Sequence, residues 1–245
     1  MLAPLLLVTS CLSSAQETAP TTETDSQQTY VYDVYYKKIA IGKMIRELQL
    51  TKQNIKINTM VDLSFLLVDF GGSQVSHIYW DEKYQLYLSK RFLRKSNGFS
   101  RVSMAAQFSN NGHNTRIVNN GVTTNFSNQE QHIVDFNTIP LQISKGLKDG
   151  QTDFEFFMQT SDAVAHYFFK VSGKELIESK FGKLDSYRVE QIKKNDRTFI
   201  VWFAVDLDYQ MVKFIYKRNL LDIHGELSEY TNKRLSADTQ TTSSR

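Results

Sequence analysis

Hydrophobic and polar residues alternate with a period of two along most of the chain after residue 30. The segments YVYDVYY (30–36) and IKINTMVDL (55–63) alternate in this way, and FIVWFAVDL (199–207) is a dense run of β-branched and aromatic residues. Because successive side chains of an extended chain point to opposite faces, these segments predict β-strands. The same criteria predict strands at 30–36, 40–50, 54–63, 65–80, 84–95, 99–109, 113–118, 122–126, 153–160, 164–178, 184–193, 198–206, 211–219 and 223–230.

Residues that favour tight turns fall between these runs. Three Asn-Gly pairs, at 97–98, 111–112 and 120–121, predict two-residue hairpin turns, because both central residues of such a turn need a positive φ. Asp149-Gly150 predicts a fourth turn of the same kind, and Gly71-Gly72 predicts a looser one.

One segment, NTIPLQISKGLKDG (137–150), departs from the period of two and predicts a short helix. Asn137 or Thr138 can cap its start, and Pro140 suits a first helical turn. Three aliphatic residues repeat along one face, namely Ile139, Ile143 and Leu147. We expect this helix to cover an open end or face of the sheet.

These elements predict an all-β protein with one short helix, folded as a single antiparallel domain over residues 30–235. The strands are too many for a flat sheet, so a strongly curved sheet or a partly open β-barrel is expected. No parallel crossover is expected, because helical patterns do not alternate with strands.

The first residues predict export and a membrane anchor. LAPLLLV (2–8) is an apolar run too short to span a bilayer, as in a secretory signal peptide over residues 1–10. The overlapping VTSC (8–11) resembles a bacterial lipobox, which implies cleavage before Cys11 and a lipid on that residue. Cleavage after Ala15 is the alternative, and it would release a soluble periplasmic or secreted protein.

Polar segments flank the predicted domain. Residues 11–29 and 236–245 are rich in Ser, Thr and Gln and poor in large apolar side chains, so they cannot repay the entropy of ordering. We expect a disordered tether and a disordered tail. The tether would reach about 20 to 25 Å as a random coil, enough to hold the domain off a membrane.

Charge restricts the partners of the chain. The net charge of +3 suits a domain near anionic lipid or polysaccharide. No nucleic-acid partner is expected, because Lys and Arg are scattered along the chain rather than clustered in a stripe. The segment YQLYLSKRFLRKS (84–96) could contact a sugar or a lipid headgroup. It also fits an ordinary strand with an aromatic core face and a solvated basic face that protects a sheet edge.

Motifs of known catalytic or cofactor sites do not occur in the sequence. It contains no GxSxG and no glycine-rich phosphate loop, and none of its five histidines lies in a catalytic motif. Asp206 and Asp208 share one side of an extended chain, but no third ligand follows, which favours a strand-end turn over a metal site. Glu175 and Glu178 are an odd number of residues apart, so they face opposite ways and make a poor acid–base pair. We assign no catalytic residue, metal or cofactor.

The second half contains VSGKELIESKFGKLDSYRVEQ (171–191) and RTFIVWFAVDLDYQMVKFIY (197–216), which predict strands with a bulge at Gly173 and a turn at Gly182. With YDVYYKKIAIG (32–42) and the central helix, they resemble the DUF3108 family of bacterial envelope domains over nearly the whole folded region. The matching positions are Gly42, Gly173, Glu175, Gly182, Trp202 and Asp206. The resemblance implies a periplasmic, sheet-rich domain with no assigned activity.

The function expected from these features is non-enzymatic. We expect a lipid-anchored protein on the periplasmic side of the envelope, at the outer membrane, whose sheet binds an apolar or amphipathic ligand or docks a partner protein. One alternative is a scaffold subunit that contacts its neighbours through a sheet edge. Another is a hydrolase of envelope glycan or lipid, with carboxylates such as Glu175 and Asp206 in a cleft.

Overall fold

The structure is a computed structural model, and it describes residues 25–65, 68–97 and 101–235. The predicted signal peptide, Cys11, Ala15 and the C-terminal tail lie outside the described residues. The first strand begins at Asp25, so the end of the predicted tether (25–29) belongs to the sheet instead. This segment joins the sheet despite its polar side chains, because its backbone pairs with a strand on each side.

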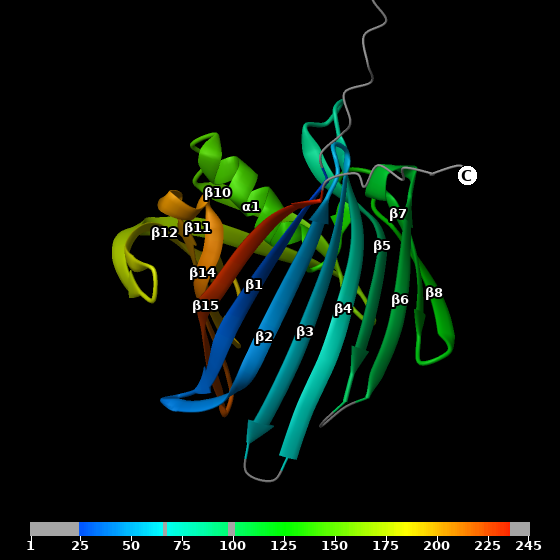
Figure 1. The fold of residues 1–245 in the computed structure, drawn as a ribbon. Helices are drawn as coiled ribbons and strands as arrows, with labels where there is room; N and C mark the ends of the chain where they lie inside the picture. The colour runs from blue at the N-terminus through cyan, green and yellow to red at the C-terminus, as the bar shows by residue number, and fades with distance from the viewer. Residues whose placement is uncertain (1–24, 66–67, 98–100, 236–245) are drawn as a thin grey trace, which may run out of the picture.

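In the described residues, fifteen strands form a single strongly curved sheet, which confirms the predicted fold class (Figure 1). The strands are β1 (Asp25–Tyr36), β2 (Ile39–Leu50), β3 (Asn54–Phe65), β4 (Val68–Asp81), β5 (Leu86–Ser96), β6 (Val102–Ser109), β7 (Asn114–Asn119), β8 (Val122–Ser127), β9 (Ile133–Val134), β10 (Asp153–Gln159), β11 (Val164–Ser179), β12 (Gly182–Ile192), β13 (Thr198–Ala204), β14 (Gln210–Arg218) and β15 (Leu221–Leu235). At the centre of the sheet β1 pairs with β15, so the two halves of the chain extend to opposite sides of this pair.

The helix α1 (Thr138–Lys148) confirms the predicted helix, with Ile139, Ile143 and Leu147 buried. It connects β9 to β10, and these two strands pair in parallel, so the expectation of no parallel crossover is wrong. Strand β9 has only two residues, too few for a period of two to reveal it. Among the described residues, no helix is long and apolar enough to cross a membrane.

Side chains bring the two ends of the sheet together. Ile133 of β9 packs in one hydrophobic cluster with Phe92 and Ile117, which lie on β5 and β7. Thr115 of β7 donates a hydrogen bond to Gln159 of β10, and both residues are buried. The sheet is therefore curled into a partly open barrel. Its two end strands, β8 and β9, are not paired with each other, and side-chain contacts join the two ends of the sheet instead.

The five predicted turns differ in outcome. Asn120-Gly121 forms the predicted two-residue turn between β7 and β8, with positive φ at both residues. Asn111-Gly112 lies in a longer connection that contains a 3₁₀ turn, η1 (Asn110–Gly112), and Asp149-Gly150 ends α1 instead of joining two strands. Gly71-Gly72 was predicted as a turn, but both residues lie inside β4, paired with Asp62 and Val61. Gly98 lies outside the described residues.

Candidate functional site

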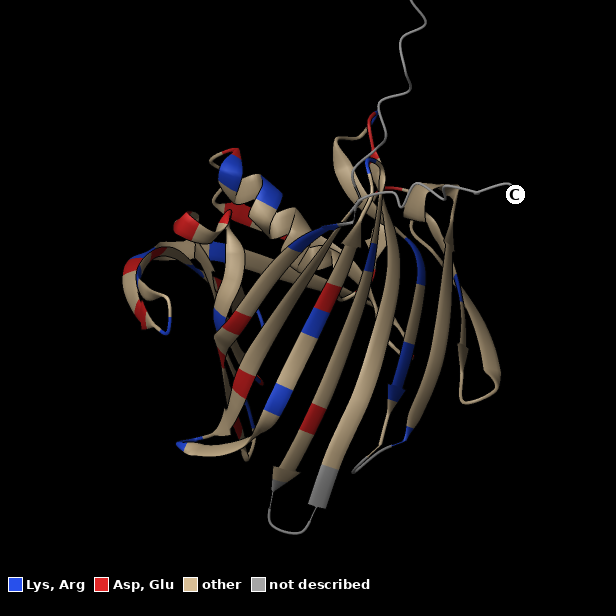
Figure 2. Cartoon of the chain, in the orientation of Figure 1, with Lys and Arg blue, Asp and Glu red and all other residues tan. Residues whose placement is uncertain are grey.

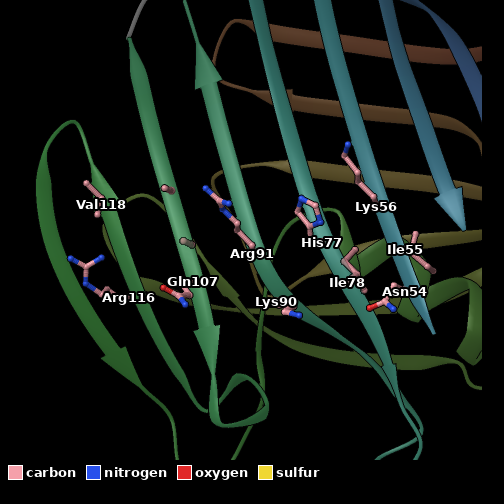
Figure 3. Close-up of a pocket in the computed structure, with 12 residues that line it drawn as sticks. Asn54, Ile55, Lys56, His77, Ile78, Lys90, Arg91, Gln107, Arg116 and Val118 are labelled. Atoms are coloured by element: carbon pink, nitrogen blue, oxygen red, sulfur yellow. The ribbon is translucent and has the colours of Figure 1, made fainter. Parts of the chain in front are cut away.

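Five polar residues line up across neighbouring strands on the face of the sheet opposite to the core. The strand registers place Lys56 opposite His77, His77 opposite Arg91, Arg91 opposite Gln107, and Gln107 opposite Arg116. The core side chains alternate with them along the same strands, as Ile57 and Phe92 do. Figure 3 shows the five side chains on the adjoining strands β3 to β7.

A β-bulge in β5 adds a fourth cation to this line. The register between β4 and β5 shifts between His77 and Ile78, so that Lys90 has no partner of its own on β4. Lys90 and Arg91 are both exposed, and they are followed by the buried Phe92. A bulge places two residues of one strand opposite one residue of the next, so both cations face His77. We call Lys56, His77, Lys90, Arg91, Gln107 and Arg116 the basic row.

The basic row lines a depression of about 570 Å³ on the outer face of the sheet (Figure 3). The next line of side chains along the same face is largely apolar. It runs from strand to strand through Val75, Leu93, Ala105 and Val118, all of them partly buried, and Ala105 and Val118 also line the depression. We call these four residues the apolar row. Charged and apolar side chains therefore lie side by side at this site.

The cations of the basic row have no acidic partners in the described parts of the chain. None of Lys56, Lys90, Arg91 and Arg116 has a carboxylate oxygen within the 4.0 Å that defines an ion pair there. Figure 2 shows Lys and Arg but no Asp or Glu on β5 to β8. Burial lowers the pKa of His77, and Lys56, Arg91 and Lys90 lower it further by repelling the imidazolium form. The site is consequently a cluster of unneutralised positive charge.

The strands below the basic row are held from inside by a buried carboxylate. Asp135, between β9 and α1, is fully buried, and its Oδ1 accepts a hydrogen bond of 2.9 Å from the Ser76 hydroxyl. The Asp135 N–H donates to Ser89 Oγ over 2.8 Å, and Ser89 shares a hydrogen bond of 2.9 Å with Thr138. Ser76 precedes His77 and Ser89 precedes Lys90, so this network supports the two strands that carry the centre of the row.

The same carboxylate begins the helix. Asp135 Oδ1 accepts hydrogen bonds from the backbone N–H groups of Asn137 and Thr138, over 2.8 and 3.2 Å. Of the two expected caps, Asn137 and Thr138, Asn137 precedes the helix, but its side chain instead donates to Ser76 and accepts from Thr59 of β3. Burial raises the pKa of Asp135 to about 6, although its hydrogen-bond donors act in the opposite direction. Asp135 therefore ties α1 to β4 and β5.

Two of the family-matched residues meet in a separate place, on β11 and β13. The indole N–H of the buried Trp202 donates to Glu175 Oε2 over 2.9 Å. Arg188 lies 3.5 Å from the other oxygen of Glu175, and Arg188 and Lys213 each lie 5.8 Å from the centre of the Trp202 ring. Glu175 is therefore engaged as a structural acceptor, and it does not line the depression.

The other matched residues shape the backbone. The register shifts next to Gly173, which is the expected bulge, and Gly182 follows the turn between β11 and β12. At Gly42 the backbone of β3 comes so close that a Cβ atom would lie 2.0 Å from the carbonyl oxygen of Asp62, so only glycine fits. Asp206 lies in the 3₁₀ turn η2 (Val205–Leu207) and accepts a hydrogen bond of 3.1 Å from the Asp185 N–H.

The remaining candidates do not form a reactive cluster in the described ranges. Asp206 and Asp208 have different partners, since Asp208 pairs with Lys148 of α1 at 2.8 Å. His113 is half-buried, with Nδ1 at 2.9 Å from the Asn128 carbonyl oxygen and its ring against His132. No group of three His, Cys, Asp or Glu residues is placed to hold a metal ion within the described residues.

Comparison with known proteins identifies the family. Residues 31–220 match the family described as "Protein of unknown function (DUF3108)". The chain belongs to this family. A crystal structure described as a β-barrel-like protein of domain of unknown function DUF1849, from Brucella abortus, aligns with a TM-score of 0.57 and 10% identity, over 86% of this chain and 98% of that one. That likeness concerns the fold alone. No curated protein matches the sequence.

Sequence reasoning missed the basic row. The cations of this row are scattered along the chain and form no stripe in the sequence. In addition, β5 was interpreted as a possible edge strand, although it lies between β4 and β6. One sequence feature could have revealed it. Residues 83–129 contain seven Lys and Arg residues and no Asp or Glu. Consecutive antiparallel hairpins bring such a segment onto one patch of sheet.

Proposed function

We propose that this DUF3108 protein is a non-enzymatic binding protein of the bacterial envelope that holds an anionic amphiphile on the outer face of its sheet. The basic row would bind the charged headgroup, and the apolar row beside it would contact the adjoining hydrocarbon. Acylation at Cys11 would keep the domain at the periplasmic face of a membrane, with release after Ala15 as the soluble alternative.

The observation that carries this proposal is that the cations of the basic row have no carboxylate partner among the residues that the structure describes. Four cations gathered on neighbouring strands repel one another, and three of them add to the effect of burial in lowering the pKa of His77. Elsewhere on the same face, carboxylates compensate such charges, as Glu226 does for Lys213 at 2.9 Å. A bound phosphate or carboxylate would relieve this repulsion through charge-assisted hydrogen bonds, which the planar guanidinium groups of Arg91 and Arg116 are suited to make.

Calorimetry with a soluble ligand tests the proposal. The full chain would be titrated with a short-chain phosphatidylglycerol below its micelle concentration, and with phosphatidylcholine of the same chain length. We expect binding of the anionic lipid only, and a loss of about tenfold or more in affinity in the double variant R91Q/R116Q. K43Q/R218Q, which also removes two cations, would bind like the unmodified chain. Equal binding by the two double variants would contradict the proposal.

A second candidate, docking of a partner protein at a sheet edge, rests on β8. This strand ends the sheet, and its six residues, VTTNFS, include no charge and no proline. Natural edge strands are usually protected by such residues against pairing with another chain. Thr123→Pro would remove an N–H group that points away from β7 and abolish strand addition, whereas Thr123→Ser would not. Native mass spectrometry of membrane-extracted protein would show whether a partner is lost in the first variant alone.

A further inference from the structure

Two tight turns lie side by side at the end of the sheet away from α1 (Figure 1). The first joins β1 to β2 through Lys37 and Lys38, and the second joins β14 to β15 through Asn219 and Leu220. The Lys37 N–H donates to the carbonyl oxygen of Asp222 over 2.8 Å, and the Tyr36 hydroxyl donates to that of Leu220 over 3.1 Å. The two turns therefore form one surface, which we call the turn pair.

Aliphatic side chains stand exposed on the turn pair. Leu220 is 87% exposed, Ile39 59% and Leu221 47%. Single exposed hydrophobic residues are common on soluble proteins, but a group of them on adjoining turns marks a surface that is covered by something else.

Positive charge surrounds these side chains. Lys37 and Lys38 have no carboxylate partner within 4.0 Å among the described residues, and Lys37 lies 5.6 Å from the centre of the Tyr36 ring. Lys217 and Arg218 are compensated by Asp222 and Asp196, at 3.4 and 3.1 Å. The turn pair thus combines exposed aliphatic side chains, an amphipathic tyrosine and two cations that lack a carboxylate partner in the described ranges.

We propose that the turn pair docks on the surface of an anionic lipid bilayer. Ile39, Leu220 and Leu221 would enter the boundary between headgroups and acyl chains, where insertion of apolar side chains is favourable. Lys37 and Lys38 would lie at the level of the negative headgroups, and Tyr36 at the depth where tyrosine is enriched in membrane proteins.

A protein partner fits the turn pair less well than a bilayer does. A stable protein interface covers about 800 Å² on each partner, far more than three side chains supply. The backbone of a two-residue turn also offers no free strand edge for pairing, unlike β8. Shallow insertion into a bilayer needs only a few apolar side chains together with complementary charge.

Flotation with vesicles tests this inference on the full chain carrying Cys11→Ser, which prevents acylation. We expect the protein to bind vesicles of phosphatidylcholine containing phosphatidylglycerol, and to bind pure phosphatidylcholine vesicles more weakly. I39S/L220S would lower the partition coefficient by at least about tenfold, because it removes two of the inserted side chains. L176S/V122S is the matched control, since these residues are 64% and 68% exposed on other hairpins. K37Q/K38Q would reduce the preference for anionic vesicles.

A fluorescent probe on the turn pair distinguishes insertion of the turn into the bilayer from electrostatic attraction without insertion. In the Cys11→Ser background, Leu220→Cys and Leu176→Cys each provide one thiol for a polarity-sensitive dye. A blue shift of emission on vesicle addition is expected at position 220 and not at position 176. Equal partition of I39S/L220S and its control, or no shift at position 220, would overturn the inference. The inference would also be overturned if R91Q/R116Q lost vesicle binding while I39S/L220S kept it, and that result would leave the proposed function intact.

Discussion

The outer face of the sheet carries two rows of charge with the same strand geometry and opposite balance. The basic row crosses β3 to β7 with cations and neutral polar residues only. The second row, which we call the paired row, crosses β12 to β2 and consists of Arg188, Trp202, Lys213, Glu226, Asp33 and Lys43. Here Lys213 pairs with Glu226 at 2.9 Å, and Asp33 lies 3.9 Å from Lys43.

The paired row is also covered, whereas no described segment of the chain covers the basic row. The hairpin of β11 and β12 reaches back over the sheet to β1, where Lys180 at its turn pairs with Asp33 at 2.8 Å. Lys180 lowers the pKa of Asp33, with smaller contributions from Ser228 and Lys43. Trp202 is only 5% exposed beneath Glu175 and Arg188. Compensated charge that is covered by its own hairpin is structural, whereas uncompensated charge around an open depression is available to a ligand.

The largest effect should come from removing the support beneath the basic row. Asp135→Ala leaves the buried Ser76 hydroxyl and the Asn137 N–H without their acceptor, which should lower the free energy of unfolding by about 3 kcal/mol. Urea denaturation measures this change. Asp33→Asn is its counterpart in the paired row, and because the Asp33 carboxylate is only partly buried, this substitution should cost less than about 1 kcal/mol. Similar losses of unfolding free energy in the two variants would contradict the distinction between the basic row, which Asp135 supports from inside, and the paired row, whose charges compensate one another.

The contribution of Asp135 to the stability of the fold should depend on pH. The folded protein holds a proton on Asp135 up to about pH 6, whereas the unfolded chain releases it near the ordinary pKa of 3.8. Protonation therefore favours the folded state between these values, and stability from this group is lost as pH rises from about 4 to 6, by about 1 to 3 kcal/mol. Asp135→Asn should lack this contribution. The test is the difference in unfolding free energy between the two proteins across that range, and a constant difference would contradict it.

A single carboxylate should make the basic row resemble the paired row. Gln107 lies directly between Arg91 and Arg116, so Gln107→Glu places a negative charge opposite both. We expect a stabilisation of about 0.5 kcal/mol and a loss of about fivefold in affinity for the anionic lipid. Gln107→Asn is the matched neutral control. Unchanged lipid affinity in the Gln107→Glu variant would show that the ligand does not bind along this row.

The smallest expected effect concerns His77. Burial and the neighbouring cations lower its pKa, so it gains charge only in acidic solution. Affinity for the anionic lipid should therefore rise by about two- to threefold as the pH falls from about 7 to 5. His77→Gln should bind with less dependence on pH. Calorimetry at several pH values decides between these outcomes, and equal slopes in the two proteins would exclude a role for His77.

Local chemistry explains the parts of the fold that were predicted from the sequence. The period of two revealed the long strands because alternate faces of a strand meet different surroundings. Residues 137–150 revealed α1 through helical spacing of its buried aliphatic residues, and Asn120-Gly121 and Gly173 revealed a turn and a bulge. Each of these features depends on neighbours within a few residues of one another.

Tertiary structure alone decided the candidate site. Lys56 and Arg116 are brought into one line only by the registers of four successive strand pairs, and the bulge at Lys90 shifts one of them. The tie from Asp135 to Ser76 also joins segments far apart in the chain. The sequence by itself therefore determined which residues form strands and which of their faces are polar. Interstrand hydrogen bonds determined which polar residues stand next to one another, because register depends on partners that local periodicity does not specify.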